Sequence, residues 1–124
     1  MNVLLWVFQS YLAASFVAFG AMKIVRDRAE LARTAFGWVE EFSDNSVKVI
    51  GLLDVLVGLG LILPGVTGIA PELVPWAALG GVALAGGGSV VHLRRSETAK
   101  AAVNLHFIAL LIAVAWGRFG PYQL

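Results

Sequence analysis

Cysteine does not occur in this chain of 124 residues. Its absence excludes disulfides, thiol redox chemistry, thiolate metal sites and iron–sulfur clusters held by this chain's own cysteines. The sequence also lacks a phosphate-binding loop, a dinucleotide fingerprint and a serine-nucleophile motif. A di-iron carboxylate bundle is excluded because it needs two Glu-x-x-His motifs and further buried glutamates. We therefore predict no metal site.

Charge is scarce as well. Only 14% of the residues are charged, 59% are hydrophobic, and the mean hydropathy is +0.83. A soluble domain of this size needs a more polar surface. The lipid bilayer is therefore the expected partner of most of the surface, and no nucleic-acid partner is expected.

The hydrophobic residues fall into four blocks, which begin at Val3, Val49, Leu73 and Ala101. A helix needs about 20 mainly apolar residues to cross about 30 Å of hydrocarbon. The first and third blocks reach that length, and the other two reach it with flanking residues. Backbone groups in lipid must bond within their own segment, so the blocks are predicted to be helices. The fold class is all-α: a single domain, residues 1–124, forms a bundle of four transmembrane helices at about 3–25, 47–64, 73–92 and 101–118.

Basic residues are divided unequally between the two sides of such a bundle. Four spans put both termini and the 64–72 loop on one side, where the basic residue is Arg118. The loops at 23–48 and 92–100 lie on the other side, which carries Lys23, Arg26, Arg28, Arg33, Lys48, Arg94, Arg95 and Lys100. Basic residues in short loops stay cytoplasmic. We therefore predict a multi-pass protein of the inner (plasma) membrane with both termini outside.

The first cytoplasmic loop has a pattern of its own in "RAELARTAFGWVEEF". Leu31, Ala35, Trp38 and Phe42 recur there at helical spacing, with charged residues elsewhere on the wheel. The pattern predicts a short amphipathic interfacial helix on the inner membrane surface. The alternative is a solvated loop with scattered apolar residues. Ser46 is predicted to cap the span that follows.

One acid interrupts the second apolar block. Asp54 is the only charged residue between Val49 and Pro64, and it shares a helix face with Gly51 and Gly58. An ionised Asp near the middle of the bilayer costs about 2.5–3.5 kcal/mol on insertion scales. Such a residue is retained when it is paired, protonated or functional, and the small residues beside it predict that it faces another helix.

The third block carries a stripe of small residues in "WAALGGVALAGGGSVVH". Gly81, Ala85, Gly88, Ser89 and His92 are spaced by three or four and share one face. Lipid tails give no hydrophobic drive to helix association, so small residues that allow close approach take its place. This face is predicted to pack against a neighbouring helix.

Several polar residues are candidate partners of Asp54. Lys23, His92, Asn104 and His106 lie toward the same, inner end of their spans, whereas Gln9 and Arg118 lie toward the outer end. Each has a structural alternative. Asp54 can be an ion pair that fixes helix register, Lys23 a lysine that snorkels to the inner surface, and the histidines interfacial hydrogen-bonding groups.

Asp54 and His92 are the candidate catalytic pair, because a carboxylate and a histidine across an apolar cavity can do general acid–base work. The candidate ligand-binding residues are Lys23, Asn104, His106, Gln9 and Arg118. A haem held by His92 and His106 is the weaker cofactor hypothesis, since two histidines at helix ends are not a specific signal.

Four motifs, taken in order along the chain, are similar to those of a known family. They are "GAMKIV" closing the first span, "IGLLDVLVGLGLILPG" in the second, "PWAALGGVALAGGGSVVHLRR" in the third and the final "VAWGRF". Over nearly its whole length the chain resembles the DoxX-like family of small four-helix integral membrane proteins. The positions that match the family's polar pattern are Lys23, Asp54, His92 and Arg118. One departure is Asp54 itself, where the family often has glutamate, so the carboxylate here reaches one methylene less far.

The resemblance implies an inner-membrane bundle, and its family name comes from a quinone-linked membrane oxidoreductase. Without cysteine, a redox role needs a bound quinone, a haem or a redox partner protein in the membrane or cytoplasm. The first hypothesis is an accessory or subunit of a membrane redox system that binds a hydrophobic small molecule such as a quinone. The second is a stand-alone membrane isomerase, cyclase or hydrolase that uses Asp54 and His92, and the third is a non-catalytic interaction scaffold. A bundle this small is also compatible with a homo-oligomer.

Overall fold

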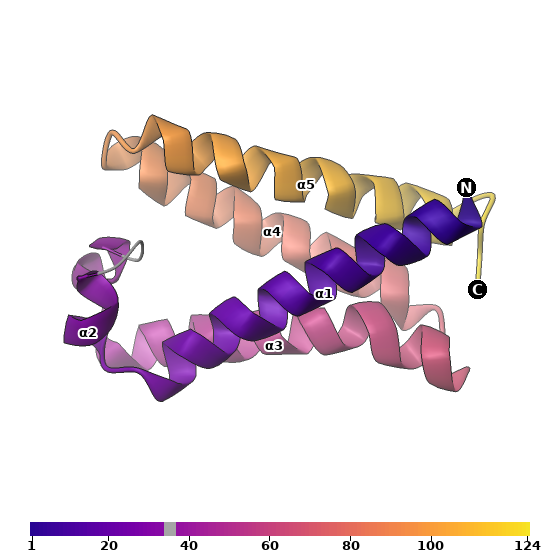
Figure 1. The fold of residues 1–124 in the computed structure, drawn as a ribbon, viewed down its shortest axis with the longest axis horizontal. Helices are drawn as coiled ribbons and strands as arrows, with labels where there is room; N and C mark the ends of the chain where they lie inside the picture. The colour runs from indigo at the N-terminus through magenta and orange to yellow at the C-terminus, as the bar shows by residue number, and fades with distance from the viewer. Residues whose placement is uncertain (34–36) are drawn as a thin grey trace.

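The computed structural model describes residues 1–33 and 37–124. Four long helices dominate it: α1 (Asn2–Val25), α3 (Asp44–Thr67), α4 (Leu73–Arg94) and α5 (Thr98–Phe119), drawn in Figure 1. Each is 22 or 24 residues long and apolar enough to cross a membrane. Every predicted span lies within one of these helices. The all-α, four-helix fold is confirmed, and the chain is a multi-pass membrane protein.

The ends of α3 show why its bounds differ from the predicted span. Ser43, not Ser46, is the N-terminal cap, because the Ser43 hydroxyl accepts a hydrogen bond from the Ser46 backbone N–H at 3.1 Å. The helix therefore begins three residues before the predicted start. Its last residue is Thr67, and Gly68 caps it with a φ of 72°, in the left-handed region. The Gly68 N–H donates to the Pro64 carbonyl.

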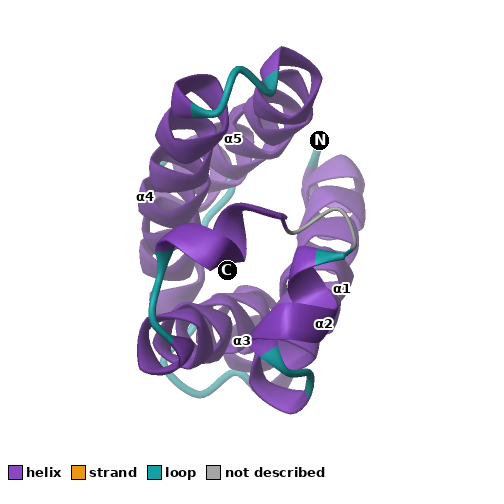
Figure 2. Cartoon of the chain, turned by 90° about the vertical axis from the view of Figure 1, so that its left-hand side faces the viewer, coloured by secondary structure: helices purple, strands orange, loops and turns teal. Residues whose placement is uncertain are grey.

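The helices pack as two pairs. Helix α1 lies along α3 and α4 lies along α5, and α3 also packs on α4. In Figures 1 and 2, α1 and α5 lie together near the chain termini and separate toward the other end of the bundle. We call the end with both termini the terminal end, and the end with the α4–α5 turn and the first loop the α2 end.

Glycine makes the α1–α3 contact close enough for polar side chains to meet. A Cβ on Gly20 would lie 2.5 Å from the Gly51 carbonyl oxygen, and a Cβ on Gly51 would lie 2.7 Å from that of Gly20. A Cβ on Gly58 would lie 2.9 Å from the Ala13 carbonyl oxygen. Backbones this near exclude any larger residue, as in other membrane helix pairs. One turn beyond Gly20, this crossing sets Lys23 opposite Asp54.

The main apolar core fills the terminal half of the bundle. Its fully buried side chains come from all four long helices and include Leu5, Leu12, Leu61, Val74 and Leu111. At this end the two helix pairs are therefore packed together through these side chains.

The first loop forms two short elements, α2 (Arg28–Ala32) and the 3-10 helix η1 (Gly37–Glu41). The predicted short helix is present, but it does not run on to Phe42 as one amphipathic stripe. Leu31 and Val39 are fully buried against Val47 of α3, so these apolar residues pack on the bundle itself. Val39 was not in the predicted stripe, because a 3-10 helix has three residues per turn and brings a different set to one face. Ala35 of that stripe lies outside the described residues.

Candidate ligand-binding site

An ion pair between α1 and α3 is the most deeply placed polar contact near the α2 end. Lys23 Nζ donates to Asp54 Oδ2 at 2.5 Å, and their side chains are only 10% and 6% exposed. The Trp38 ring of η1 covers the ammonium, with its centroid 5.3 Å from Nζ. Of the four candidate partners of Asp54, the structure thus selects Lys23, which the close Gly20–Gly51 crossing brings within reach.

This pair lies in the wall of a cavity of about 740 Å³ between the two helix pairs. The cavity is within the size range of small-molecule sites, and its lining is mainly apolar with a few polar groups, as such sites require. The apolar and aromatic side chains in its wall include Phe16, Phe19, Trp38, Phe42, Ile50, Leu84, Val91, Val103 and Phe107. The polar ones are Tyr11, Ser15, Lys23, Asp54, His92, Lys100, Asn104 and His106.

His92 stands in the cavity wall at the end of α4, where it contacts a carboxylate. Its Nδ1 lies 3.0 Å from Glu97 Oε1, and its side chain is 11% exposed. Arg95 Nε and Lys100 Nζ also donate to the two Glu97 oxygens, each at 3.1 Å. The His92 hydrogen bond, followed by that of Lys100, lowers the pKa of Glu97 from 4.5 to about 2, against a smaller opposing effect of burial. Glu97 is therefore ionised at neutral pH.

Helix α5 supplies the edge of the cavity that faces α1. The Tyr11 hydroxyl and His106 Nε2 are 2.7 Å apart, and His106 Nδ1 hydrogen-bonds the Val103 carbonyl. A carbonyl only accepts, so Nδ1 carries the proton, and in the neutral ring the Tyr11 hydroxyl donates to Nε2. Both side chains are exposed on the outside of the bundle. This bond is a polar link between α1 and α5.

Asn104 stands beside His106 on the same edge of the cavity. Its Nδ2 donates a long hydrogen bond of 3.4 Å to the Ala85 carbonyl of α4. That carbonyl also accepts from the Ser89 hydroxyl at 2.9 Å. A Cβ placed on Gly88 would lie 2.8 Å from the Asn104 amide nitrogen, so the small residue makes room for this side chain. The predicted small-residue face of α4 thus serves both packing and the cavity, because Gly81, further along it, packs on Leu111.

The structure does not bring Gln9 and Arg118 to this cavity. They bind each other at the terminal end, where Arg118 Nε donates to Gln9 Oε1 at 2.8 Å. Gln9 Nε2 donates in turn to the Leu61 carbonyl at 2.7 Å, linking α5 through α1 to α3. Arg118 Nη1 donates to Asn2 Oδ1 and to the Tyr122 carbonyl. These contacts link three helices at the terminal end, and neither Gln9 nor Arg118 lines the cavity described above.

Sequence reasoning found five of the residues that meet around the cavity: Lys23, Asp54, His92, Asn104 and His106. It missed Glu97 and the covering role of Trp38. Glu97 is five residues beyond His92, outside ordinary helical spacing, and only the conformation of the turn brings it back. The sequence did hold a signal for Glu97: it is a lone acid between Arg95 and Lys100, a few residues after a histidine at a helix end.

Metal and haem chemistry find little support in the arrangement of side chains. Within residues 1–33 and 37–124, no three His, Asp or Glu side chains are grouped to hold a metal ion. His106 has both ring nitrogens in hydrogen bonds, so it would have to give up Tyr11 or Val103 to bind a haem iron. The His92–His106 haem hypothesis is therefore not carried further.

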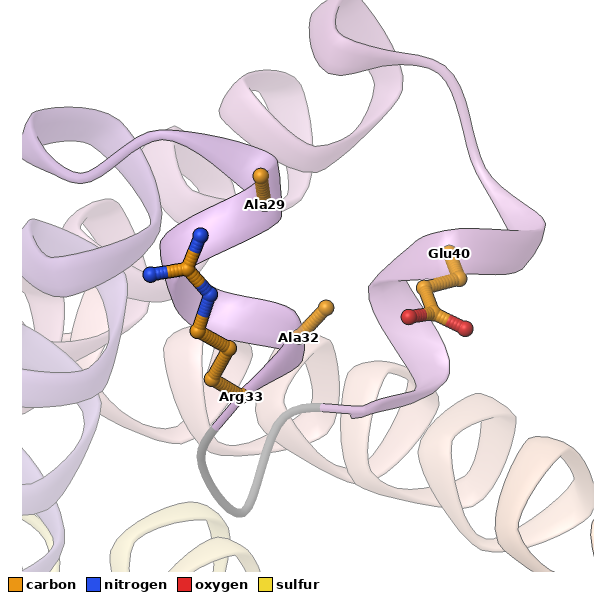
Figure 3. Close-up of a pocket in the computed structure, with 4 residues that line it drawn as sticks. All are labelled: Ala29, Ala32, Arg33 and Glu40. Carbon is orange, nitrogen blue, oxygen red and sulfur yellow. The ribbon is translucent and has the colours of Figure 1, made fainter.

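A smaller hollow of about 330 Å³ lies between α2 and η1. Figure 3 shows its four lining residues, with Arg33 at the end of α2 and Glu40 on η1. Both charged side chains are exposed, so this hollow is a surface depression.

Comparison with known families agrees with this architecture. A model of the DoxX-like family matches residues 7–114, which include most of α1 through α5 and every cavity residue named above. The chain belongs to the DoxX-like family. No curated protein and no solved structure matches it. The family match therefore identifies the fold, whereas the chemistry of this DoxX-like protein depends on the residues of its own cavity.

Proposed function

We propose that this DoxX-like protein binds a hydrophobic small molecule, with a quinone as the favoured class, in the cavity between its helix pairs. The observation that carries the proposal is a cavity of about 740 Å³ whose mainly apolar wall contains a buried ion pair and a histidine. A simple packing defect in a membrane bundle has no need of buried charge, which is costly in lipid. Polar groups around an apolar space are the usual design of a small-molecule site.

The lining fits a planar molecule with oxygen atoms at its edge. Aromatic side chains of α1, η1 and α5 offer ring contacts, and Phe16, Phe19 and Phe107 pack edge to face around one side. Lys23 is a cationic donor that can reach a ligand carbonyl while Asp54 compensates its charge. Neither the ring contacts nor the donor requires a protein thiol, in keeping with a chain that has no cysteine.

Lipid-soluble molecules would enter from the bilayer between α1 and α5. These helices separate toward the α2 end, and the exposed Tyr11 and His106 stand at that edge of the cavity. Opening requires the loss of one side-chain hydrogen bond, which costs about 1 kcal/mol. The ligand-binding residues in this proposal are Lys23, Asn104 and His106, together with Asp54 and His92.

The physiological role follows as an accessory or subunit of a membrane redox system, because the protein would hold a redox-active molecule but has no cysteine to carry electrons itself. We place it in the inner (plasma) membrane with the α2 end in the cytoplasm and both termini outside. Contact with a redox partner, or with further copies of the chain, would use its exposed helix faces. A stand-alone acid–base enzyme remains the second candidate, favoured by one observation: His92 reaches the cavity while a carboxylate holds its far nitrogen.

The test uses two adjacent glycines of α4 as a matched pair. Gly87 lines the cavity and Gly86 does not, and a Cβ on either one meets no atom within 4 Å. Gly87→Leu should fill part of the cavity, whereas Gly86→Leu should leave it open, with equal gains in helix propensity. The probe is a decyl-substituted benzoquinone, measured by equilibrium partition into nanodiscs that contain wild type or either variant.

We expect saturable binding of about one probe per chain to wild type and Gly86→Leu, and a loss of at least about tenfold in affinity for Gly87→Leu. Equal uptake by all three proteins and by empty nanodiscs would overturn the proposal. Conversion of an apolar substrate by the purified protein alone would instead support the enzyme hypothesis. Loss of a partner's assembly without any bound ligand would support the scaffold.

A further inference from the structure

The α4–α5 turn folds a carboxylate back onto the histidine that ends α4. Ser96 has a φ of 59°, in the left-handed region, and the Glu97 N–H donates to the His92 carbonyl at 2.8 Å. This six-to-one hydrogen bond is the signature of a Schellman motif at a helix C-terminus. It returns Glu97 to the level of His92, and the side-chain contact at 3.0 Å follows from the backbone geometry.

The contact fixes which nitrogen of His92 carries a proton. An ionised carboxylate only accepts hydrogen bonds, so Nδ1 must be the donor toward Glu97 Oε1. Arg95 and Lys100 keep Glu97 ionised and in place. In the neutral imidazole the other nitrogen, Nε2, then has a free lone pair on the opposite edge of the ring. Within the described residues, Nε2 has no hydrogen-bond partner, and His92 lines the cavity.

The two sides of the cavity are therefore chemically different. On the α1–α3 side, Lys23 offers a cationic donor compensated by Asp54. On the α4–α5 side, His92 in its neutral form offers an acceptor at Nε2. A ligand with only acceptor oxygens satisfies the first side and leaves the His92 lone pair unpaired, which costs free energy in a place shielded from water.

We infer that Glu97 is a positioning residue that presents His92 Nε2 as a hydrogen-bond acceptor, so that the cavity selects ligands bearing a hydroxyl group, of the phenol or hydroquinone class. The inference rests on the proposed function, because it specifies the chemistry of the ligand in the same cavity. It requires no covalent step. The hydroxyl donates to His92, and an oxygen on the other side of the ligand accepts from Lys23.

The experiment compares two probes that differ only in the donor, 4-decylphenol and 4-decylanisole. Their binding to the full chain in nanodiscs is measured by equilibrium dialysis for wild type, Glu97→Gln, His92→Phe and Glu41→Gln. Glu41 is the matched control, since its carboxylate lies 3.9 Å from Arg95 in the same charge cluster, whereas among the described contacts of His92 the carboxylate is that of Glu97. Wild type and Glu41→Gln should prefer the phenol by about tenfold, the effect of one well-made hydrogen bond in a dry site.

The preference should disappear in His92→Phe and fall to about threefold or less in Glu97→Gln, while the anisole binds all four proteins alike. Equal binding of both probes to wild type, or a preference that survives His92→Phe, overturns the inference and leaves the proposed function standing. Failure of both probes to bind wild type above empty nanodiscs overturns the proposed function and the inference with it.

A spectroscopic readout separates positioning from simple stabilisation. The chain has only two histidines, so selective ¹⁵N labelling gives two sets of ring signals. We expect His92 as the Nδ1–H tautomer in wild type, and a mixture of tautomers in Glu97→Gln with the His106 signals unchanged. An Nε2–H tautomer in wild type, or a His92 signal that ignores Glu97→Gln, would contradict the inference whatever happens to the melting temperature.

Discussion

Two buried cations are accommodated in this bundle in different ways. Lys23 pairs with a carboxylate, Asp54, and so brings a full counter-charge into the interior. Arg118 is only 3% exposed and has no acid beside it within the described residues. It spreads its charge over neutral oxygens, among them those of Gln9 and Tyr122, and over the Trp6 ring at 5.3 Å. The first arrangement leaves a cation that can exchange a contact with a ligand in the cavity, whereas the second holds its cation with neutral groups of the chain away from the cavity.

Replacement of Asp54 by Asn tests the ion pair. The amide keeps the shape but leaves Lys23 as an uncompensated buried charge, and breaking such a pair costs about 3–5 kcal/mol in soluble proteins. We expect a lower melting temperature for Asp54→Asn and substantial recovery in the double variant Lys23→Met/Asp54→Asn. Benzoquinone binding should fall in both. A single variant that melts and binds like wild type would show that the ion pair serves neither stability nor the site.

Glu97 makes the stability of the fold depend on pH in the acid range. Its pKa is about 2 in the folded chain against a usual 4.5, so ionised Glu97 stabilises the fold. Because the folded pKa is the lower one, this stabilisation is complete above about pH 4.5 and is lost as the pH falls toward 2. Wild type should melt above Glu97→Gln at pH 7, and the difference should shrink in a pH series from 5 to 2.5. A melting-temperature difference between wild type and Glu97→Gln that grows as the pH falls would contradict a stabilising role for ionised Glu97.

At the scale of the elements, the decisive contact is the glycine crossing of α1 and α3. The sequence pointed to a stripe of small residues on α4 as a packing face and to Gly51 and Gly58 as neighbours of Asp54 on a face toward another helix. The closest backbone approaches are in fact at Gly20, Gly51 and Gly58, between α1 and α3. This crossing sets the register that pairs Lys23 with Asp54, so packing and the site depend on the same glycines.

Gly51→Ala should therefore be severe. The added Cβ would lie 2.7 Å from the Gly20 carbonyl oxygen, a backbone atom that cannot move without shifting α1. Gly86→Ala is the control, because its Cβ meets nothing within 4 Å and alanine favours a helix over glycine by about 1 kcal/mol. In detergent, Gly51→Ala should melt lower than wild type and Gly86→Ala at least as high. Equal melting of the two variants would rule out the close crossing.

The parts of the structure that were predictable from sequence are those that lipid itself dictates. Four apolar blocks must be helices in a bilayer, and the spans were placed within three residues of the observed ends. A carboxylate among apolar residues must find a partner, and Lys23 was one of four candidates at the inner end of the spans. Local backbone conformation was not predictable in the same way. The 3-10 turn that buries Val39 and the left-handed Ser96 that returns Glu97 to His92 leave no periodic pattern.

For the whole molecule, charge distribution bears on orientation. Lys23 lies inside α1 and is paired, so it no longer counts as a loop residue. The α2 end still carries the other seven basic residues, and at the terminal end Arg118 is buried. Basic residues therefore remain concentrated at the α2 end even when Lys23 is not counted. Basic residues near helix ends stay cytoplasmic.

We therefore expect the C-terminus outside. An alkaline phosphatase fusion after Leu124 should be active and a green fluorescent protein fusion there dark, with the opposite result for fusions inserted at Ser96 in the α4–α5 turn. A fluorescent C-terminal fusion would invert the proposed orientation. The cavity would then open near the other face of the membrane, since its polar groups are gathered toward the α2 end.

The central claim is that a lipid-soluble molecule sits between the two helix pairs, and photo-crosslinking with a decyl-benzoquinone that carries an azide tests it most directly. After illumination in nanodiscs, mass spectrometry locates the labelled residues. The account predicts adducts on cavity residues from both pairs, such as Phe19 of α1 and Phe107 of α5, that disappear in Gly87→Leu and persist in Gly86→Leu. Labelling confined to lipid-facing residues such as Leu52 and Ile112, and indifferent to Gly87→Leu, would contradict it.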